Sequence, residues 1–170
     1  MRKPRLLISF LLILFFSSVS HATTVQRLTL DDLVRKAHKI VVGKIVKSRS
    51  FWSGNAKLIL TAYTVEVEET IKGEPSHTIE LTTIGGTVGD RTLHVAGMPS
   101  FAAGENAILF VENSGVFSTV VGLEQGRFTV ANGEVSNALT ELSFPDGRPG
   151  KPLKMPLGNF KRQIKVILDR

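Results

Sequence analysis

The segment Leu58–Ile71, LILTAYTVEVEETI, carries the clearest structural pattern in the chain. Its middle alternates, because Tyr63, Val65 and Val67 are apolar and the residues between them are polar. Successive side chains of a strand point to opposite faces of a sheet, so this alternation predicts a half-buried antiparallel strand. The adjacent pair Glu68-Glu69 interrupts the alternation and predicts a β-bulge near the end of the strand.

A helix, a strand and a turn are expected before this segment. Thr29–Lys39 has apolar residues at the spacing of one helix face, and Thr29, followed by two aspartates, is typical of a helix start. Ile40–Ser50 is β-branched at its beginning and polar at its end, which predicts a strand buried in its first half. Phe51–Lys57, FWSGNAK, contains Ser-Gly-Asn and predicts the turn that leads into Leu58–Ile71.

Further short strands, separated by glycine-containing turns, are expected after it. They are His77–Ile84, Arg91–Ala96, Ala107–Glu112, Val116–Leu123 and Arg127–Ala131. Ala107–Glu112 is apolar almost throughout, so we expect it at the centre of the sheet. Asn132-Gly133 predicts a two-residue hairpin into Glu134-Val135. Many short strands without alternating helices favour an antiparallel barrel or sandwich.

The last part of the chain changes in composition. Four of the seven prolines lie between Pro145 and Pro156, together with several glycines, which predicts a connector with little regular structure. Asn159 is then expected to cap a final helix whose apolar face is formed by Phe160, Ile164, Ile167 and Leu168.

The first 22 residues have the three parts of a secretory signal peptide. Basic residues near the N-terminus precede the apolar run Leu6–Phe16, and Ser20 and Ala22 suit the small-residue positions of a cleavage site. The apolar run is shorter than the roughly 20 residues that a membrane span requires. We therefore expect cleavage after Ala22, a mature protein beginning at Thr23, and a periplasmic or extracellular location.

These patterns divide the chain into four parts. Residues 1–22 are the expected signal peptide, residues 23–136 a β-barrel domain, residues 137–158 the connector and residues 159–170 the C-terminal helix. The formal net charge is +6, but three basic residues belong to the expected signal peptide and seven more lie between Arg148 and Arg170. The body of the protein therefore lacks the basic excess of a nucleic-acid-binding face, and no nucleic acid partner is expected.

Three stretches of the chain resemble the core of the netrin-like domain. They are Ala37–Val46 (AHKIVVGKIV), Tyr63–Gly73 (YTVEVEETIKG) and Phe101–Val111 (FAAGENAILFV). This domain occurs in tissue inhibitors of metalloproteinases, and its wider group has an OB-type barrel; small exported bacterial proteins are similar too. The resemblance implies a mainly β fold: an antiparallel OB-like (netrin-like) β-barrel with a short N-terminal helix and a C-terminal helix.

The same resemblance makes a secreted metalloprotease a candidate partner. In those inhibitors, a disulfide-fixed N-terminal Cys presents its amino and carbonyl groups to the protease zinc. This chain contains no Cys, and its expected mature N-terminus is Thr23. We therefore do not transfer the zinc-binding mechanism. The absence of Cys also excludes thiol catalysis and Cys-ligated zinc.

Two sets of residues are candidates for binding. Phe51 and Trp52 lie at the expected hairpin tip, where aromatic side chains can contact a partner, although both rings could instead fold over the barrel mouth. Lys161, Arg162 and Lys165 lie on the polar face of the C-terminal helix and could contact anionic lipid or polymer. The alternative is that this helix docks on its own barrel and leaves the basic residues in solvent.

No catalytic, metal-binding or cofactor-binding motif is present. His38, His77 and His94 form no H-E-x-x-H pattern, although His77 and His94 could meet from distant strands, and Ser100 lacks the G-x-S-x-G frame of a nucleophile. The sequence therefore predicts an exported, non-enzymatic module that binds a secreted protein. An envelope-associated module that binds anionic polymer or lipid through its basic tail is the alternative, and a hydrolase is less favoured.

Overall fold

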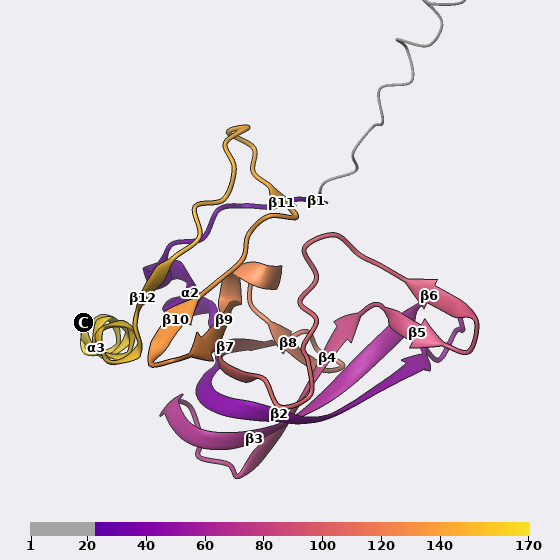
Figure 1. Ribbon diagram of the computed structural model, residues 1–170, viewed down its shortest axis with the longest axis horizontal. Helices are drawn as coiled ribbons and strands as arrows, with labels where there is room; N and C mark the ends of the chain where they lie inside the picture. The colour runs from indigo at the N-terminus through magenta and orange to yellow at the C-terminus, as the bar shows by residue number, and fades with distance from the viewer. Residues whose placement is uncertain (1–22) are drawn as a thin grey trace, which may run out of the picture.

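The computed structural model describes residues 23–170, and two long strands run along the lower side of the molecule in Figure 1. The expected signal peptide, residues 1–22, lies outside the described residues. Strand β2 (Lys39–Trp52) and strand β3 (Ile59–Lys72) each contain 14 residues and pair antiparallel. The fold is mainly antiparallel β-structure with two α-helices, as the sequence predicts at this level.

The β2–β3 pair contains the bulge predicted in Leu58–Ile71. Val42 pairs with Glu69 and Gly43 pairs with Val67, so Glu68 is the extra residue on β3. The predicted turn at Phe51–Lys57 is wrong at its start, because Phe51 and Trp52 are the last two residues of β2. Aromatic residues suit a half-buried strand surface, and cross-strand pairing to β3 extends the strand to this point.

Within residues 23–170 the main sheet has eight strands. Besides β2 and β3 these are β4 (Thr78–Ile84), β7 (Asn106–Asn113), β8 (Ser118–Val120), β9 (Arg127–Ala131), β10 (Glu134–Ser136) and β12 (Lys154–Pro156). The hydrogen-bonded order is β12-β10-β9-β7-β2-β3-β4, with β8 also paired to β7. Among residues 23–170, no pairing between β4 and β8 closes this path into a ring, so the hydrogen bonds do not form a closed barrel.

Two small pairs of strands flank the sheet. β5 (Gly86–Val88) and β6 (Arg91–Leu93) form a hairpin, and β1 (Thr23–Thr24) runs parallel to β11 (Leu142–Ser143). The sequence prediction omitted β1, β5, β11 and β12. The connector predicted at residues 137–158 therefore contains short strands and the start of a helix.

The core lies on both faces of β2 and β7. Ile40 and Phe110 belong to one buried cluster, which both α-helices cover. Val41 and Leu109, at the alternate positions, belong to a second cluster that includes Tyr63. Because neighbouring side chains of these strands point to opposite faces, the apolar runs predicted for the sheet centre fill both clusters.

Helix α2 (Leu30–Lys36) begins where the sequence predicts. The Thr29 hydroxyl accepts a hydrogen bond from the Asp32 N–H, and the Asp32 carboxylate accepts one from the Thr29 N–H, which forms a capping box. The helix ends at Lys36, three residues before the predicted end, because Ala37 is extended and leads into β2. Leu33 and Val34 are buried against the sheet.

Helix α3 (Leu157–Leu168) begins two residues earlier than predicted. Its N-cap is Pro156, so the predicted cap at Asn159 is wrong. Proline has a fixed φ and no N–H that would need a partner, which suits it to a helix start. The Asn159 side chain instead accepts a hydrogen bond from Arg162 inside the first turns. Neither helix of the described chain is long and apolar enough to span a membrane.

Candidate binding surface

The outer face of β2, β3 and β4 carries a row of apolar side chains near the hairpin tip. Phe51 pairs with Leu60, and Leu60 pairs with Ile84 on the next strand. All three are half-buried. Tyr63 and Leu81, which have the opposite parity on the same strands, point into the core and are 6% and 0% exposed. The Phe51 row therefore faces outward.

Cationic side chains border this apolar row. The Arg49 guanidinium carbon lies 4.9 Å from the centroid of the Phe51 ring, which is a cation–π contact. Lys47 lies two residues before Arg49 on β2, and Lys57 lies in the turn; all three cations are exposed. Within residues 23–170, none of the three forms an ion pair with a carboxylate. We call Lys47, Arg49, Phe51, Leu58 and Leu60 the hairpin face.

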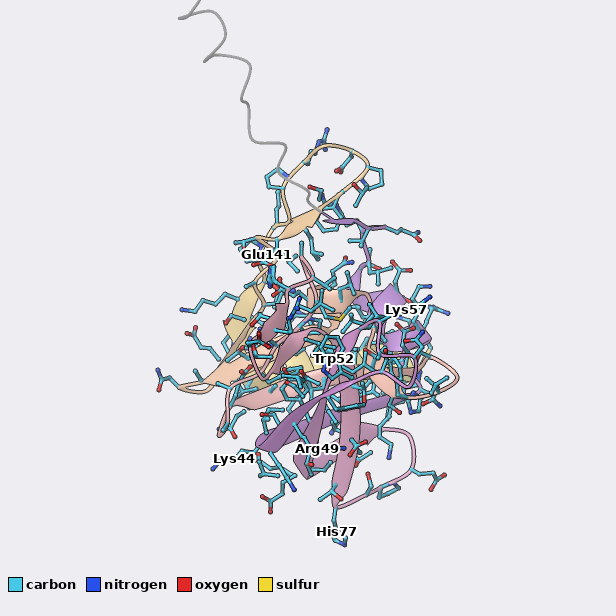
Figure 2. The ribbon with its side chains drawn as sticks, turned by 90° about the vertical axis from the view of Figure 1, so that its right-hand side faces the viewer. Lys44, Arg49, Trp52, Lys57, His77 and Glu141 are labelled. Atoms are coloured by element: carbon cyan, nitrogen blue, oxygen red, sulfur yellow. The ribbon has the colours of Figure 1, made fainter. Side chains whose placement is uncertain are left out.

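Trp52 lies at the same end of the hairpin but on the opposite face of β2 from Phe51. It pairs with Ile59, which is 2% exposed, while Trp52 itself is 43% exposed and Leu58 is 41% exposed. Figure 2 shows Trp52 at this end of the molecule, between Arg49 and Lys57. The structure thus brings Phe51 and Trp52 to one end of the hairpin and presents them on its two faces.

The turn between β2 and β3 is held by side-chain hydrogen bonds. The Ser53 N–H donates to the Leu58 carbonyl over 2.8 Å, and the Leu58 N–H donates to the Ser53 hydroxyl over 3.1 Å. Asn55 Oδ1 accepts bonds from the Ser53 hydroxyl and from the Lys57 N–H. These bonds fix the turn that carries Lys57 and Leu58, so the surface is ordered before any partner binds.

The basic residues predicted on the C-terminal helix have different surroundings. Lys161 forms an ion pair with Glu69 of β3, Arg162 donates to Asn159, and Lys165 is exposed to solvent. On the opposite side of the helix, Phe160 and Ile164 are 0% exposed. Helix α3 is thus docked on the body of the protein.

A small polar pocket holds His94 and Ser100 together with Glu124 and Glu141, two titratable residues that the sequence patterns did not single out. His94 Nε2 lies 3.4 Å from Glu141 Oε2, which also accepts a hydrogen bond from the Gly97 N–H. Glu124 lines the same pocket, whose volume is about 130 Å³. Glu124 lies on the 3-10 helix η1 (Leu123–Gly126), and Glu141 lies directly before β11. No local sequence motif marks either position.

Glu124 is the unusual member of this pocket. One of its carboxylate oxygens, Oε2, is buried and has no hydrogen-bond partner. Burial raises the pKa of the Glu124 carboxyl, and the nearby charge of Glu141 raises it further. His77 lines a different pocket, beside Glu68 and Glu69, so the two histidines do not share a site. Within residues 23–170, no three His, Asp or Glu side chains are grouped as metal ligands.

Comparison with models of protein families, with curated proteins and with solved structures finds no match to this chain. The function is therefore inferred from the chain's own residues. The hairpin face joins exposed apolar groups to cations that have no carboxylate partner, an arrangement suited to binding. Ser100 also lines the pocket around Glu124, but within residues 23–170 no hydrogen bond joins its hydroxyl to His94, Glu124 or Glu141. The pocket therefore lacks a nucleophile in contact with a general base, and the hairpin face has the stronger claim to function.

Proposed function

We propose that this chain is an exported, non-enzymatic binding module, and that it contacts a secreted protein partner through the hairpin face and Trp52. One observation carries the proposal: Trp52 and Leu58 are exposed at the tip of an ordered hairpin, and within residues 23–170 its cations Lys47, Arg49 and Lys57 form no ion pair with a carboxylate. Aromatic residues and Arg are enriched among the residues that dominate binding energies at protein interfaces.

The order of the first segments supports export. The basic residues, apolar run and small residues of residues 1–22 match a signal peptide that is cleaved after Ala22. The protein would then reach the periplasm or the extracellular medium and meet its partner there. With no Cys in the chain, the exported protein depends on its two buried clusters for stability.

The strand pairing supports a partly open OB-type barrel of the netrin-like kind. β2 pairs with β3 and β7, β3 pairs with β4, and β7 pairs with β8. β4 lies beside β8 in space without a hydrogen-bonded ladder between them. These neighbours support a five-stranded, partly open barrel of the OB type, in which the β2–β3 turn would correspond to the first binding loop. The netrin-like resemblance makes a secreted metalloprotease the first partner to test.

The test is capture of a partner by the exported protein from its own extracellular or periplasmic fraction, with identification by mass spectrometry. We expect Trp52→Ala to weaken the capture by at least about tenfold, as for a residue that dominates an interface. Val116→Ala is the matched control, because Val116 is an apolar residue that is 91% exposed and lies in the β7–β8 turn. If Trp52→Ala captures as much of the partner as Val116→Ala and the parent do, the proposed role of the hairpin is overturned.

An anionic polymer or lipid is the alternative ligand, bound through the C-terminal helix. Arg162 and Arg170 line an open groove between α2 and α3, and Val166 in that groove is 53% exposed. Binding of this kind falls steeply with salt, because the contacts are between charges in solvent. Capture that resists moderate salt and requires Trp52 favours the protein partner instead.

A further inference from the structure

The second half of β2 has a neighbouring strand on one side only. β7 pairs with β2 from Lys39 to Lys44, and the next residue, Ile45, exchanges hydrogen bonds with the backbone of the Gly104-Glu105 loop segment. From Val46 to Trp52, β2 pairs with β3 alone. Figure 1 shows this half of the strand running outward to the hairpin tip. Among the described residues no strand pairs with the other side of Val46–Trp52, and β5 contacts β2 through Gly86, which lies against the Ser50 side chain. This side of the strand is an unpaired sheet edge.

The hydrogen-bond pattern identifies the backbone groups on this edge. The Ser53 N–H donates to Leu58 across the hairpin, whereas the Ile59 carbonyl accepts from Gly85 on the far side of β3. Because N–H and C=O groups of successive residues point to opposite edges of a strand, Trp52, Ser50 and Ser48 direct theirs away from β3. Three N–H groups and three carbonyls are thus available to a further strand.

The side chains beside this edge determine what can pair with it. Lys47 and Arg49 are exposed on the outer face of the edge, and neither has a carboxylate partner. A second copy of this chain pairing antiparallel to the same edge would place like charges side by side, which is destabilising. A strand that carries carboxylates at alternate positions would instead face both cations. The edge thus disfavours self-association and is complementary to an acidic strand.

We propose that the Val46–Trp52 edge of β2 receives an extended acidic segment of the partner protein as an additional strand. Backbone hydrogen bonds to Ser48, Ser50 and Trp52 supply affinity, and carboxylates beside Lys47 and Arg49 select the sequence. The inference rests on the proposed function, because it states what kind of protein segment binds at the hairpin. It extends that function by placing the contact on the strand edge.

The probe is a fluorescent seven-residue peptide that alternates glutamate and valine, titrated against the exported protein and followed by anisotropy. We expect saturable binding, and a loss of at least about tenfold when alternate peptide nitrogens are methylated, because methylation removes donors and leaves every carboxylate in place. Slower hydrogen exchange at the Ser48, Ser50 and Trp52 amides is expected on binding. Lys47→Glu with Arg49→Glu should weaken binding by a similar factor.

Two protein variants test the edge itself. Ser48→Pro removes one N–H that points away from β3 and is tolerated in an edge strand, so we expect a native fold and binding that is about tenfold weaker. Ser48→Ala is the matched control and should bind like the parent. If Ser48→Pro does not fold, the methylated peptide still tests the edge with the unchanged protein.

Equal binding of the methylated peptide, or no change in amide exchange, would overturn the inference. So would competition by dextran sulfate or phosphatidylglycerol vesicles as strong as that by the unlabelled peptide. Absence of binding up to about 1 mM peptide would also overturn it, since that concentration corresponds to very weak association. If Trp52→Ala weakens partner capture and Ser48→Pro does not, the proposed function stands and the edge inference fails.

Discussion

At the scale of single residues, Gly43 marks a close approach of β2 to β3. A Cβ added at this position would lie 2.5 Å from the Glu66 carbonyl oxygen and 2.8 Å from Val65 Cγ1. Because one of these atoms is backbone, the strands would have to move apart. We expect Gly43→Ala to lower the free energy of unfolding by about 1–3 kcal/mol, measured by urea denaturation.

Gly54 in the β2–β3 turn is the matched control for this substitution. An added Cβ there meets nothing within 4 Å. We expect Gly54→Ala to change the free energy of unfolding by no more than about 0.5 kcal/mol. Equal stability of the two variants would contradict the close approach at Gly43.

Glu124 makes the stability of the fold depend on pH. Its pKa in the folded state is raised above the ordinary value of 4.5, first by burial and then by the charge of Glu141. The folded state therefore binds this proton more tightly than the unfolded state, so stability falls as the pH rises from the unfolded pKa through the folded pKa. We expect Glu124→Gln to be more stable than the parent near about pH 7 and to lose this advantage near about pH 4.

Thermal unfolding at the two pH values checks this expectation. Glu80→Gln is the control, because Glu80 is exposed on β4 and should give the same difference from the parent at both pH values. If the difference in melting temperature between Glu124→Gln and the parent is also the same at both pH values, burial of Glu124 does not make the stability depend on pH.

Single-residue predictions succeeded where a local interaction decides the structure. Thr29 caps α2, Asn132 and Gly133 take positive φ values of 51° and 76° in their hairpin, and Glu68 forms the bulge. Each outcome depends on atoms a few residues away. Glu124 could not be identified in this way, because it meets Glu141 and His94 only after the chain folds.

At the scale of elements, α3 is part of the core. The Phe160 ring centroid lies 4.6 Å from that of Phe128, and Phe160 is 0% exposed. We expect Phe160→Ala to lower the free energy of unfolding by about 3–5 kcal/mol, because it leaves a cavity among aromatic rings. Urea denaturation measures this loss, and Val166→Ala, at a residue that is 53% exposed, should have little effect. Similar losses in both variants would contradict the docking of α3.

The short strands of the connector explain the largest gap between sequence and structure. Met155 pairs with Val135 and Thr23 pairs with Leu142, yet neither segment has the alternation or length of a recognisable strand. Their pairing depends on partners elsewhere in the chain, and Pro156 ends β12 at an edge of the sheet where its missing N–H does no harm. Long strands with regular alternation, such as β3, were predictable because their pattern is internal.

At the scale of the whole molecule, the hairpin face and the C-terminal helix are separate surfaces. The charge-reversed variant Arg162→Glu with Lys165→Glu should therefore capture the same protein partner as the parent, measured by the same pull-down at moderate salt. Both side chains are exposed, so the fold should be retained. Loss of the partner in this variant would favour the C-terminal helix as the binding surface. Deleting residues 151–170 would be a poorer test, because it removes Phe160 and β12.

The parallel pair β1–β11 has a consequence for how quickly the protein reaches its native state. The Val25 N–H donates to the Ser143 carbonyl, and Arg27 contacts Asp146 across a separation of 119 residues. Such non-local contacts raise the contact order and slow folding, because a long loop must close before they form. The beginning of the described chain therefore stays unpaired until residues near 146 have been made and released. Under the export proposed above, this delay would leave the chain unfolded when it reaches the membrane.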